Sequence, residues 1–409
     1  MEHELELTGS HKFMQHETDI AIAGSGLAGL TASAALARLG FRVTNVSPAP
    51  TREDRRTTAL LAASVDLLRR CGVWEDLVPA PAPLEVMRII DGTGRLIRAP
   101  QADFHASEIG LEAFGYNVEN SAIEKVLKDA CLSRGVHFVE DHVSGLHIRE
   151  DGVSVETGEG NVVDARLCIG ADGRNSSVRT LAGFGERAWS YRQTAIVLNF
   201  SCEYPHENTS TEFHTANGPF TIVPLGERLC SLVWVDDPEA ARTWIERPRP
   251  ELALEVERRM QSMLGKVEIA SDVQAWPLSG MVARRFGSGP VVLVGEAAHV
   301  FPPIGAQGFN LGIRDIEVLE QLVSGKRANE LGNIGIEYHR RRSADIASRG
   351  ASIDLLNRSL LSGFLPVQAI RTLGLSLLGT VGPLRRLVMR EGVSPGGQAN
   401  AVYDRLRTG

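Results

Sequence analysis

The sequence has few cysteines and no motif that pairs them. The five thiols, Cys71, Cys131, Cys168, Cys202 and Cys230, are odd in number and widely spaced, and none belongs to a CxxC motif. This spacing argues against a disulfide framework and against a zinc site. We therefore expect reduced thiols in a cytoplasmic protein.

Long hydrophobic runs are also absent. Although 43% of the residues are hydrophobic, no uninterrupted apolar run reaches the roughly 18 residues that a spanning helix needs. Residues 1–17 are acidic, contain histidine and lack an apolar core, so they are neither a signal peptide nor an anchor. We interpret them as a disordered tail.

An excess of positive charge is missing from most of the chain. The net charge is −7, so nucleic acid is not an expected partner. Residues 340–409 differ, because they hold eleven Arg, no Lys and four acidic residues, and Ser359–Pro383 carries a single charge, Arg371. This region is typical either of a surface that contacts anionic lipid or of a helical hairpin with solvated arginines.

A glycine-rich turn stands near the start of the chain. Asp19–Ala23 is a predicted strand, Gly24-Ser25-Gly26-Leu27-Ala28-Gly29 follows it, and a helix is predicted to Leu39. In such a turn Gly24 makes the bend, Gly26 lets a pyrophosphate approach the backbone and Gly29 packs helix on strand. The pattern predicts a dinucleotide site.

The second predicted strand, Phe41–Val46, ends at Ser47. A dinucleotide site usually has an acidic residue here to bind the ribose hydroxyls. Because a hydroxyl makes a weaker hydrogen bond than a carboxylate does, Ser47 predicts weakened cofactor binding.

Two further segments place an acidic residue after a predicted strand. Asp172 and Gly173 lie in GADGRNSSVR, and Glu296 follows the apolar strand Val291–Val294 in GEAAHVFPPIGAQGFN. Pro302 and Pro303 predict a rigid loop, and Gln307–Leu322 is a predicted helix. Each acidic residue is a candidate ligand of ribose or ribityl hydroxyls, and capping of the next helix is the alternative role for Asp172.

Together these motifs resemble the class A FAD-dependent aromatic hydroxylases, which are p-hydroxybenzoate hydroxylase-like. The third segment is similar to their GDAAHxxxPxxGxGxN, with Glu296 and Ala306 as departures, and GADGRNSSVR matches their second motif. Two further segments resemble the ubiquinone-biosynthesis hydroxylases within this family. They are GYNVEN at 115–120 and the Y-x-x-x-R-x-x-D pattern from Tyr338 to Asp345.

The resemblance implies a set of site residues. No side chain is assigned as acid or base, and His299 is expected to be structural. The loop expected to face the flavin contains Pro303, Gly305 and Gln307. The residues expected to bind FAD are Gly24, Gly26, Gly29, Ser47, Arg56, Asp172, Gly173, Glu296, Gly308, Phe309 and Asn310. No metal site is expected, and the lack of a second GxGxxG agrees with an NAD(P)H that binds transiently.

The expected fold is α/β, with a Rossmann-like, glutathione-reductase-like FAD-binding domain and an inserted, mostly antiparallel sheet. The FAD-binding domain is predicted at 18–80, 106–185 and 284–340, the substrate domain at 81–105 and 186–283, and a helical C-terminal region at 341–409. Phe213, Phe220, Trp234 and Trp276 are candidates for a substrate cavity in that sheet, with plain core packing as the alternative.

The resemblance implies a monooxygenase that hydroxylates an aromatic ring with O2 and NAD(P)H. Three hypotheses stay open: a hydroxylase of a polyprenylated phenol in ubiquinone biosynthesis, a hydroxylase of a small soluble aromatic compound, and a weakly FAD-binding accessory or lipid-binding subunit. Expected partners are the aromatic substrate, a membrane surface at the C-terminal region and a biosynthetic multi-protein complex. The expected location is cytoplasmic, with the inner face of the membrane as a peripheral site.

Overall fold

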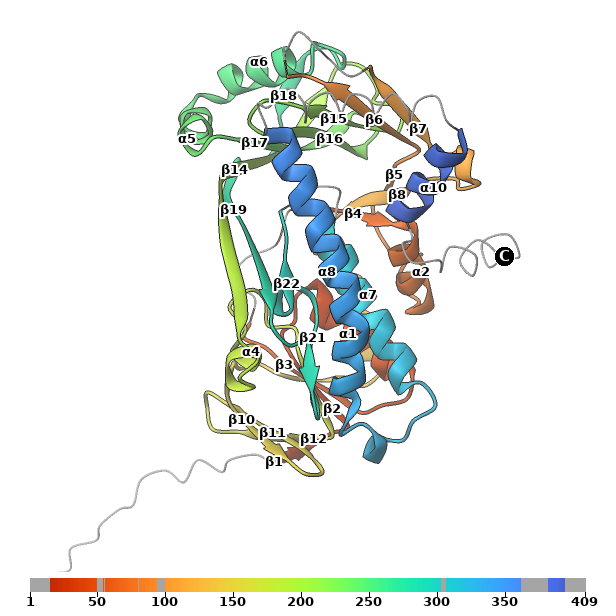
Figure 1. The fold of residues 1–409 in the computed structure, drawn as a ribbon, viewed down its shortest axis with the longest axis vertical. Coiled ribbons are helices and arrows are strands. Elements are labelled where there is room, and N and C mark those ends of the chain that lie inside the picture. The colour runs from red at the N-terminus through yellow and green to blue at the C-terminus, as the bar shows by residue number, and fades with distance from the viewer. Residues whose placement is uncertain are drawn as a thin grey trace, which may run out of the picture.

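The structure is a computed structural model, and it describes residues 15–49, 54, 56–79, 81–93, 100–302, 307–361 and 382–393. A mainly parallel sheet with its helices occupies the lower part of Figure 1, and a large, mostly antiparallel sheet occupies the upper part. The predicted α/β class is therefore confirmed.

The parallel sheet has six strands in the order β20-β21-β13-β2-β3-β9. Its central strands are short apolar runs with every residue buried, as expected for a sheet covered on both faces. Ala23 lies opposite Gly170, and Gly170 lies opposite Leu293, so three strands end at one edge. The strands are β2 (Ile20–Ala23), β3 (Val43–Val46), β9 (His137–Val139), β13 (Leu167–Gly170), β20 (Gly287–Ser288) and β21 (Val291–Leu293).

Helices pack closely around this sheet. Helix α1 (Leu27–Arg38) contacts α3 (Asn120–Ser133) and α7 (Gln307–Val323), and its buried alanines and glycine allow a close approach. Helix α8 (Ile334–Leu361) packs on α7 and on β21, and Figure 1 shows it extending from there to the large sheet. It crosses residue 341, where a domain boundary is predicted.

A small four-stranded sheet flanks the parallel sheet in the order β1-β12-β11-β10. Strand β1 (Gln15–Glu17) pairs in parallel with β12, so the prediction of a disordered tail is wrong for these three residues. Backbone pairing orders them. The other strands are β10 (Val143–Arg149), β11 (Gly152–Thr157) and β12 (Val162–Ala165).

A three-stranded sheet, β4-β8-β5, lies between the two large sheets. The local sequence from Asp54 towards Arg70 favours one helix, but Thr57–Leu61 form strand β4, and helix α2 (Ala62–Arg70) begins only after it. The strand forms because Thr57–Leu61 pairs along its whole length with β8 (Gly115–Glu119). Strand β5 (Ala82–Pro83) pairs with the other edge of β8.

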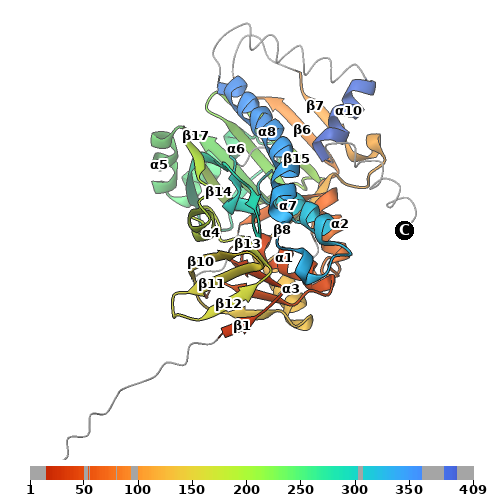
Figure 2. The ribbon, with the colours of Figure 1, turned by 60° about the horizontal axis from the view of Figure 1, so that its bottom comes forward.

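The large sheet has nine strands in the order β22-β19-β14-β17-β16-β15-β6-β7, with β18 paired to β14. Helices α5 (Pro238–Glu246) and α6 (Arg249–Arg259) cover its outer face, as the green helices in Figures 1 and 2 show. The strands are β6 (Val86–Asp91), β7 (Ala102–His105), β14 (Glu186–Cys202), β15 (Thr209–His214), β16 (Pro219–Gly226), β17 (Leu229–Asp236), β18 (Val267–Ile269), β19 (Gln274–Ala283) and β22 (His299–Val300).

Short helices complete the described chain. They are η1 (Ala106–Ile109), α4 (Ser177–Leu181), η2 (Gly295–Ala297), η3 (Ala328–Glu330) and α10 (Gly382–Val393). Helix α10 packs on η1, where Arg385 bonds the carboxylate of Glu108 at 2.6 Å. Most of the apolar stretch Ser359–Pro383 lies outside the described residues.

Candidate FAD and substrate site

The three glycine-rich segments converge at the edge where β2, β13 and β21 end. A Cβ on Gly24, which has φ of +107°, would lie 2.4 Å from the carbonyl oxygen of Ala171. A Cβ on Gly29 would lie 2.0 Å from the carbonyl oxygen of Gly24. A side chain fits neither position, so these two glycines are needed for packing.

Gly26 differs from both neighbours in the motif. Its backbone is extended, with φ of −72° and ψ of 179°, and a Cβ there would meet no atom within 4 Å. It precedes α1, whose first turn has no side-chain cap, so the amides of that turn are left for another acceptor. Space beside a helix N-terminus fits the pyrophosphate of FAD.

The third segment reaches the same place from β21. Gly295 has φ of +60°, and a Cβ on it would lie 2.9 Å from the Cβ of Ala28 in α1. A Cβ on Gly312 of α7 would in turn lie 3.2 Å from the Cα of Gly295. Glu296 is exposed beside this contact, as a ligand of the ribityl chain needs to be.

The acidic residue of the second segment makes contacts within its own loop. Asp172 accepts hydrogen bonds from the Ser176 hydroxyl at 2.5 Å and from the Val178 amide at 3.1 Å, so its carboxylate caps α4. Gly173 has φ of +77° and open space at its Cβ position. Arg179 of the same motif donates to the carbonyl of Ala297 at 2.8 Å and so ties α4 to the third segment.

The predicted flavin-facing loop lies largely outside the described residues. Pro303 and Gly305 lie outside the described residues, and of Gln307 only the backbone, at the start of α7, is described. Gly308 is exposed with open space at its Cβ position, and Phe309 is half-buried.

The side chain of Asn310, a predicted cofactor ligand, is hydrogen-bonded within the chain. Its Oδ1 accepts from the Leu61 amide at 2.9 Å and from the Ser64 hydroxyl at 2.6 Å, while its Nδ2 donates to the Ala59 carbonyl at 2.8 Å. Both ends of the buried amide thus bind the chain. The side chain fixes the junction of β4 and α2 against α7.

Arg56 is held by a polar cluster that the sequence does not reveal. Its guanidinium makes two bonds to Asp54, at 2.8 and 2.7 Å, and lies 5.4 Å from the ring centre of Trp276. Hydrogen bonding to Asp54, together with the nearby charges of Asp54 and Glu296, raises the pKa of Arg56. The candidate residues Arg56 and Glu296 therefore lie within electrostatic reach of each other.

Asn120 completes this cluster. Its Nδ2 donates to Asp54 at 2.8 Å, and its Oδ1 accepts from the Thr58 hydroxyl at 2.6 Å. Because the side chain is used here, it does not cap the following helix, and α3 begins at Asn120 without a side-chain cap. The sequence alone predicts that Asn120 or Ser121 caps this helix, and the structure contradicts that prediction.

A buried ionic network supports the third segment from behind. Asp315 Oδ2 lies 2.8 Å from His299 Nε2 and accepts from the Gly295 amide at 2.8 Å, and its Oδ1 accepts from Arg342 Nε at 2.6 Å. Burial alone would raise the pKa of Asp315, but His299 and Arg342 outweigh burial and lower it. His299 is buried in this network, which supports the structural role expected for it.

Tyr338 and Arg342 belong to the Y-x-x-x-R-x-x-D pattern. Tyr338 donates to the carbonyl of Leu293 at 2.8 Å, and Arg342 also pairs with Asp345. The pattern therefore binds α8 to the end of β21, two residues before Gly295.

Three of the four aromatic cavity candidates are core residues. Phe213, Phe220 and Trp234 pack in the cluster under α5 and α6, on the outer face of the large sheet. The cavity role predicted for them is wrong, because the alternation along β15, β16 and β17 turns these positions away from the glycine-rich segments. Trp276 is 47% exposed and faces Arg56.

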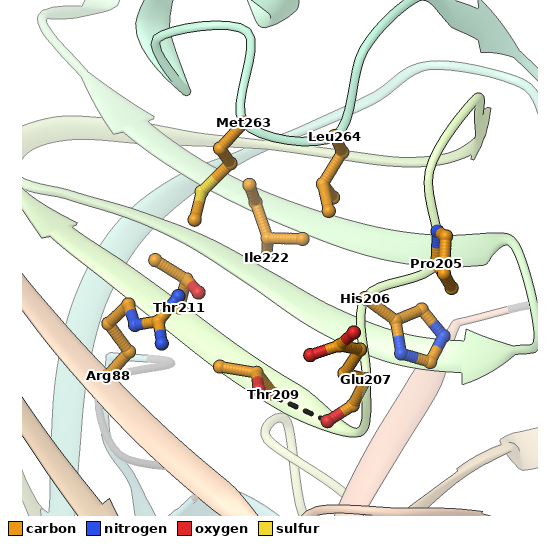
Figure 3. Close-up of a pocket in the computed structure, with 9 residues that line it drawn as sticks. All are labelled: Arg88, Pro205, His206, Glu207, Thr209, Thr211, Ile222, Met263 and Leu264. Carbon is orange, nitrogen blue, oxygen red and sulfur yellow. Dashed lines mark hydrogen bonds between the residues drawn. The ribbon is translucent and has the colours of Figure 1, made fainter.

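A cleft of about 250 Å³ opens on the outer face of the same sheet. Figure 3 shows Met263, Leu264 and Ile222 on one side and the polar side chains of Arg88, Thr211 and Glu207 on the other. His206 accepts from the Asn208 amide at 3.1 Å and bonds the Gly226 carbonyl, so both ring nitrogens are engaged. This cleft is separated from the glycine-rich segments by the sheet.

The thiols are inert in this fold. All five cysteines are unpaired and buried. Burial raises the pKa of Cys71 to about 11 and that of Cys131 to about 12. In the described part of the chain, no three His, Cys, Asp or Glu residues gather as metal ligands do.

Ser47 offers a direct test of the ribose contact. It is 8% exposed at the end of β3. We expect Ser47→Asp to tighten FAD binding by about 1 kcal/mol, typical of one improved hydrogen bond, or roughly five- to tenfold in Kd. FAD titration followed by flavin fluorescence measures this, with Ser47→Ala as control. Unchanged or weaker binding by Ser47→Asp would show that this position does not meet the ribose.

Comparison with known proteins agrees with this geometry. Residues 17–332 match the family model described as FAD binding domain. The chain is 32% identical to 3-demethoxyubiquinol 3-hydroxylase of Escherichia coli over 91% of its length and 97% of that protein. It is 33% identical to ubiquinone hydroxylase UbiL of Rhodospirillum rubrum over 91% of its length and 88% of that protein.

Solved structures show the same fold. p-Nitrophenol 4-monooxygenase PnpA of Pseudomonas putida superposes with a TM-score of 0.75 at 18% identity, covering 94% of this chain and 100% of that one. Aklavinone-11 hydroxylase, in a complex with FAD and aklavinone, superposes with a TM-score of 0.60 at 22% identity, covering 76% of this chain and 62% of that one. The chain therefore belongs to the FAD binding domain family, and within it to the FAD-dependent monooxygenases that include the ubiquinone hydroxylases.

Proposed function

We propose that this protein hydroxylates the ring of a polyprenylated phenol in ubiquinone biosynthesis, with O2 and with NAD(P)H as transient reductant. The observation that carries the proposal is the convergence of three distant glycine-rich segments at one sheet edge, in a chain with relatives named as ubiquinone hydroxylases. FAD, when bound, supplies the redox chemistry that activates O2.

The chain's own residues bind and enclose the cofactor. The amides at the start of α1, beside Gly26, hold the pyrophosphate, and Ser47 binds the ribose. Glu296 binds the ribityl chain, and Arg56 lies beside it. Gly24 and Gly29 allow the turn to pack closely against neighbouring backbone. Gly173 and Gly308 leave free space for the cofactor.

The test is NADPH oxidation by purified protein with FAD added, with and without a prenylated phenol, together with mass spectrometry of the phenol. We expect the phenol to stimulate oxidation and to gain one oxygen atom. Stimulation by small soluble phenols alone would favour the second hypothesis. A protein that neither binds FAD nor oxidises NADPH would support the accessory subunit.

We also propose peripheral contact with the inner face of a membrane, and with a biosynthetic complex there, through the C-terminal region. On α10 the side chain of Leu387 is 58% exposed and follows the exposed Arg386. A cation beside an exposed apolar side chain suits an anionic lipid surface. No helix in the described ranges is long and apolar enough to cross a bilayer.

Vesicle co-sedimentation tests the membrane contact. We expect Arg386→Glu to reduce the fraction bound to anionic vesicles several-fold, because one cation near such a surface contributes about 1 kcal/mol. Lys326→Glu, a charge reversal at an exposed position three residues after the end of α7, is the control. Equal losses from both variants would show only an effect of net charge.

A further inference from the structure

A polar pair occupies the inner face of the large sheet, on strand β15. Glu212 and His214 are two residues apart and so project from the same face. His214 Nε2 lies 2.9 Å from Glu212 Oε1, and the Thr221 hydroxyl of β16 donates to Glu212 Oε2 at 3.4 Å. The His214 side chain is 7% exposed and that of Glu212 is 21% exposed.

The register of the strands shows which face this is. Thr221 lies opposite Glu212 on one side and opposite Val233 on the other. Two residues before Val233, Ser231 bonds the Thr57 hydroxyl of β4 at 2.9 Å and the Asn117 amide of β8 at 3.2 Å. The pair therefore lies on the face that meets β4 and β8, opposite to the face covered by α5 and α6.

An apolar patch lies on the same face, two strands away from the pair. Ala195, Val235 and Leu278 form a buried cluster, against which Tyr191 and Val233 pack while partly exposed. His214 of β15 lies opposite Pro219 of β16, and the next residue, Phe220, lies opposite Trp234 of β17. Val235 of the patch follows Trp234, so His214 is two strands from the patch. Apolar surface beside a few polar groups is the usual lining of a site for an aromatic ligand.

The pairing determines what the imidazole can do. Since Glu212 accepts at Nε2, the neutral imidazole keeps its proton on Nε2, and Nδ1 is the nitrogen that can accept a proton. The imidazolium that results is stabilised by the carboxylate 2.9 Å away. Asp91, the neighbour of His214 on β6, is engaged by Thr93, whose hydroxyl donates to Oδ1 at 2.6 Å.

We propose that Glu212 and His214 bind the ring hydroxyl of the aromatic substrate and remove its proton. The O–H bond of the phenol breaks, an N–H bond forms at His214 Nδ1, and Glu212 balances the new positive charge. The phenolate is the more electron-rich ring and so the better acceptor of oxygen. This inference rests on the proposed function, because it assigns a catalytic residue to that reaction.

Ionisation of a bound probe tests the pair without turnover. The probe is a nitrophenol with one isoprenoid chain, whose phenolate absorbs visible light, titrated from acid to neutral pH on the FAD-loaded protein. We expect binding to the wild type to lower the pKa of the probe by one unit or more, as a nearby opposite charge does. His214→Asn and Glu212→Gln should bind the probe and abolish that shift.

The chain contains a matched control pair. His147 Nε2 lies 2.9 Å from Glu156 Oε1 on the β10–β11 hairpin, with side chains 64% and 46% exposed. His147→Asn and Glu156→Gln should leave the shift unchanged. In turnover, the His214→Asn and Glu212→Gln variants should form product about a hundredfold more slowly, a typical effect of losing a general base. Their FAD content and thermal midpoint should be retained.

The outcomes separate the two levels of the proposal. A shift that persists in both His214→Asn and Glu212→Gln overturns the inference and leaves the function standing. A wild type that binds FAD but not the probe overturns both. If either variant fails to fold, Thr221→Val, which removes only the weak bond to Glu212, should reduce the shift partially, and an undiminished shift would contradict the inference.

Discussion

The Asp315→Ala variant is expected to lose about 3–5 kcal/mol of unfolding free energy, the usual effect of removing one partner from a buried ion pair. Arg342 donates to Asp315 at 2.6 Å, and the two side chains are only 2% and 1% exposed. Without the carboxylate the buried guanidinium keeps only its pair with Asp345 and loses the fully buried counter-charge, and the Gly295 amide and His299 lose their acceptor. Urea denaturation followed by circular dichroism measures the loss.

The pH dependence of this variant follows from the lowered pKa of Asp315. A carboxyl whose pKa is lower in the folded state stabilises the protein above its unfolded pKa, about 3.9, and that stabilisation is lost as pH falls through the lower folded value. The difference in unfolding free energy between wild type and Asp315→Ala should therefore be largest near neutral pH and should shrink in acid.

A double-mutant cycle and a surface pair provide controls. Asp315→Leu combined with Arg342→Met should be less destabilised than the sum of the two single variants, because neither charge is then left alone. Glu337→Gln, which breaks a 2.9 Å pair with Arg341 at the exposed side of α8, should have a far smaller effect. Equal effects of Asp315→Ala and Glu337→Gln would contradict a structural role for the network.

The dinucleotide turn was predictable because its requirements are local. The positions of Gly24 and Gly29 follow from close contacts between a strand, a turn and a helix that are adjacent in sequence. The strand before the turn and the helix after it were placed to within a few residues, as β2 and α1 show. Short-range geometry can thus be predicted from one sequence.

Strand β4 could not be predicted in the same way. Thr57–Leu61 contains residues compatible with a helix start, and it becomes a strand through its pairing with Gly115–Glu119, far away in the chain. The same holds for the polar cluster of Asp54 and Asn120, which joins both segments. Non-local pairing overrides local propensity here.

The aromatic residues show a second limit. Alternation predicts that neighbouring strand residues face opposite sides, but it does not tell which side faces the cofactor. Phe213 lies between Glu212 and His214 in sequence and faces the opposite side of the sheet. Choosing Phe213 as a cavity residue therefore selected the wrong face and missed the polar pair. Only the contacts of Ser231 with β4 and β8 identify the inner face.

The Gly26→Val variant is expected to fold normally and to bind FAD about a hundredfold more weakly. The extended backbone of Gly26 accepts a side chain, and nothing in the chain stands within 4 Å of its Cβ position. A valine would instead fill the space beside the first amides of α1, where the pyrophosphate is proposed to bind. Losing one or two hydrogen bonds to a charged group costs about 3 kcal/mol, which corresponds to roughly a hundredfold in Kd.

Gly29→Ala is the matched variant that separates binding from folding. Its added Cβ would lie 2.0 Å from the Gly24 carbonyl oxygen, so α1 would have to move away from the turn. This variant should lower the thermal midpoint of the protein without FAD, whereas Gly26→Val should leave that midpoint unchanged and lower only the FAD-bound one. Because a ligand at free concentration L stabilises a folded protein by RT ln(1 + L/Kd), the difference between the midpoints with and without FAD reports FAD affinity. Normal FAD affinity in Gly26→Val would show that the pyrophosphate does not lie against this turn.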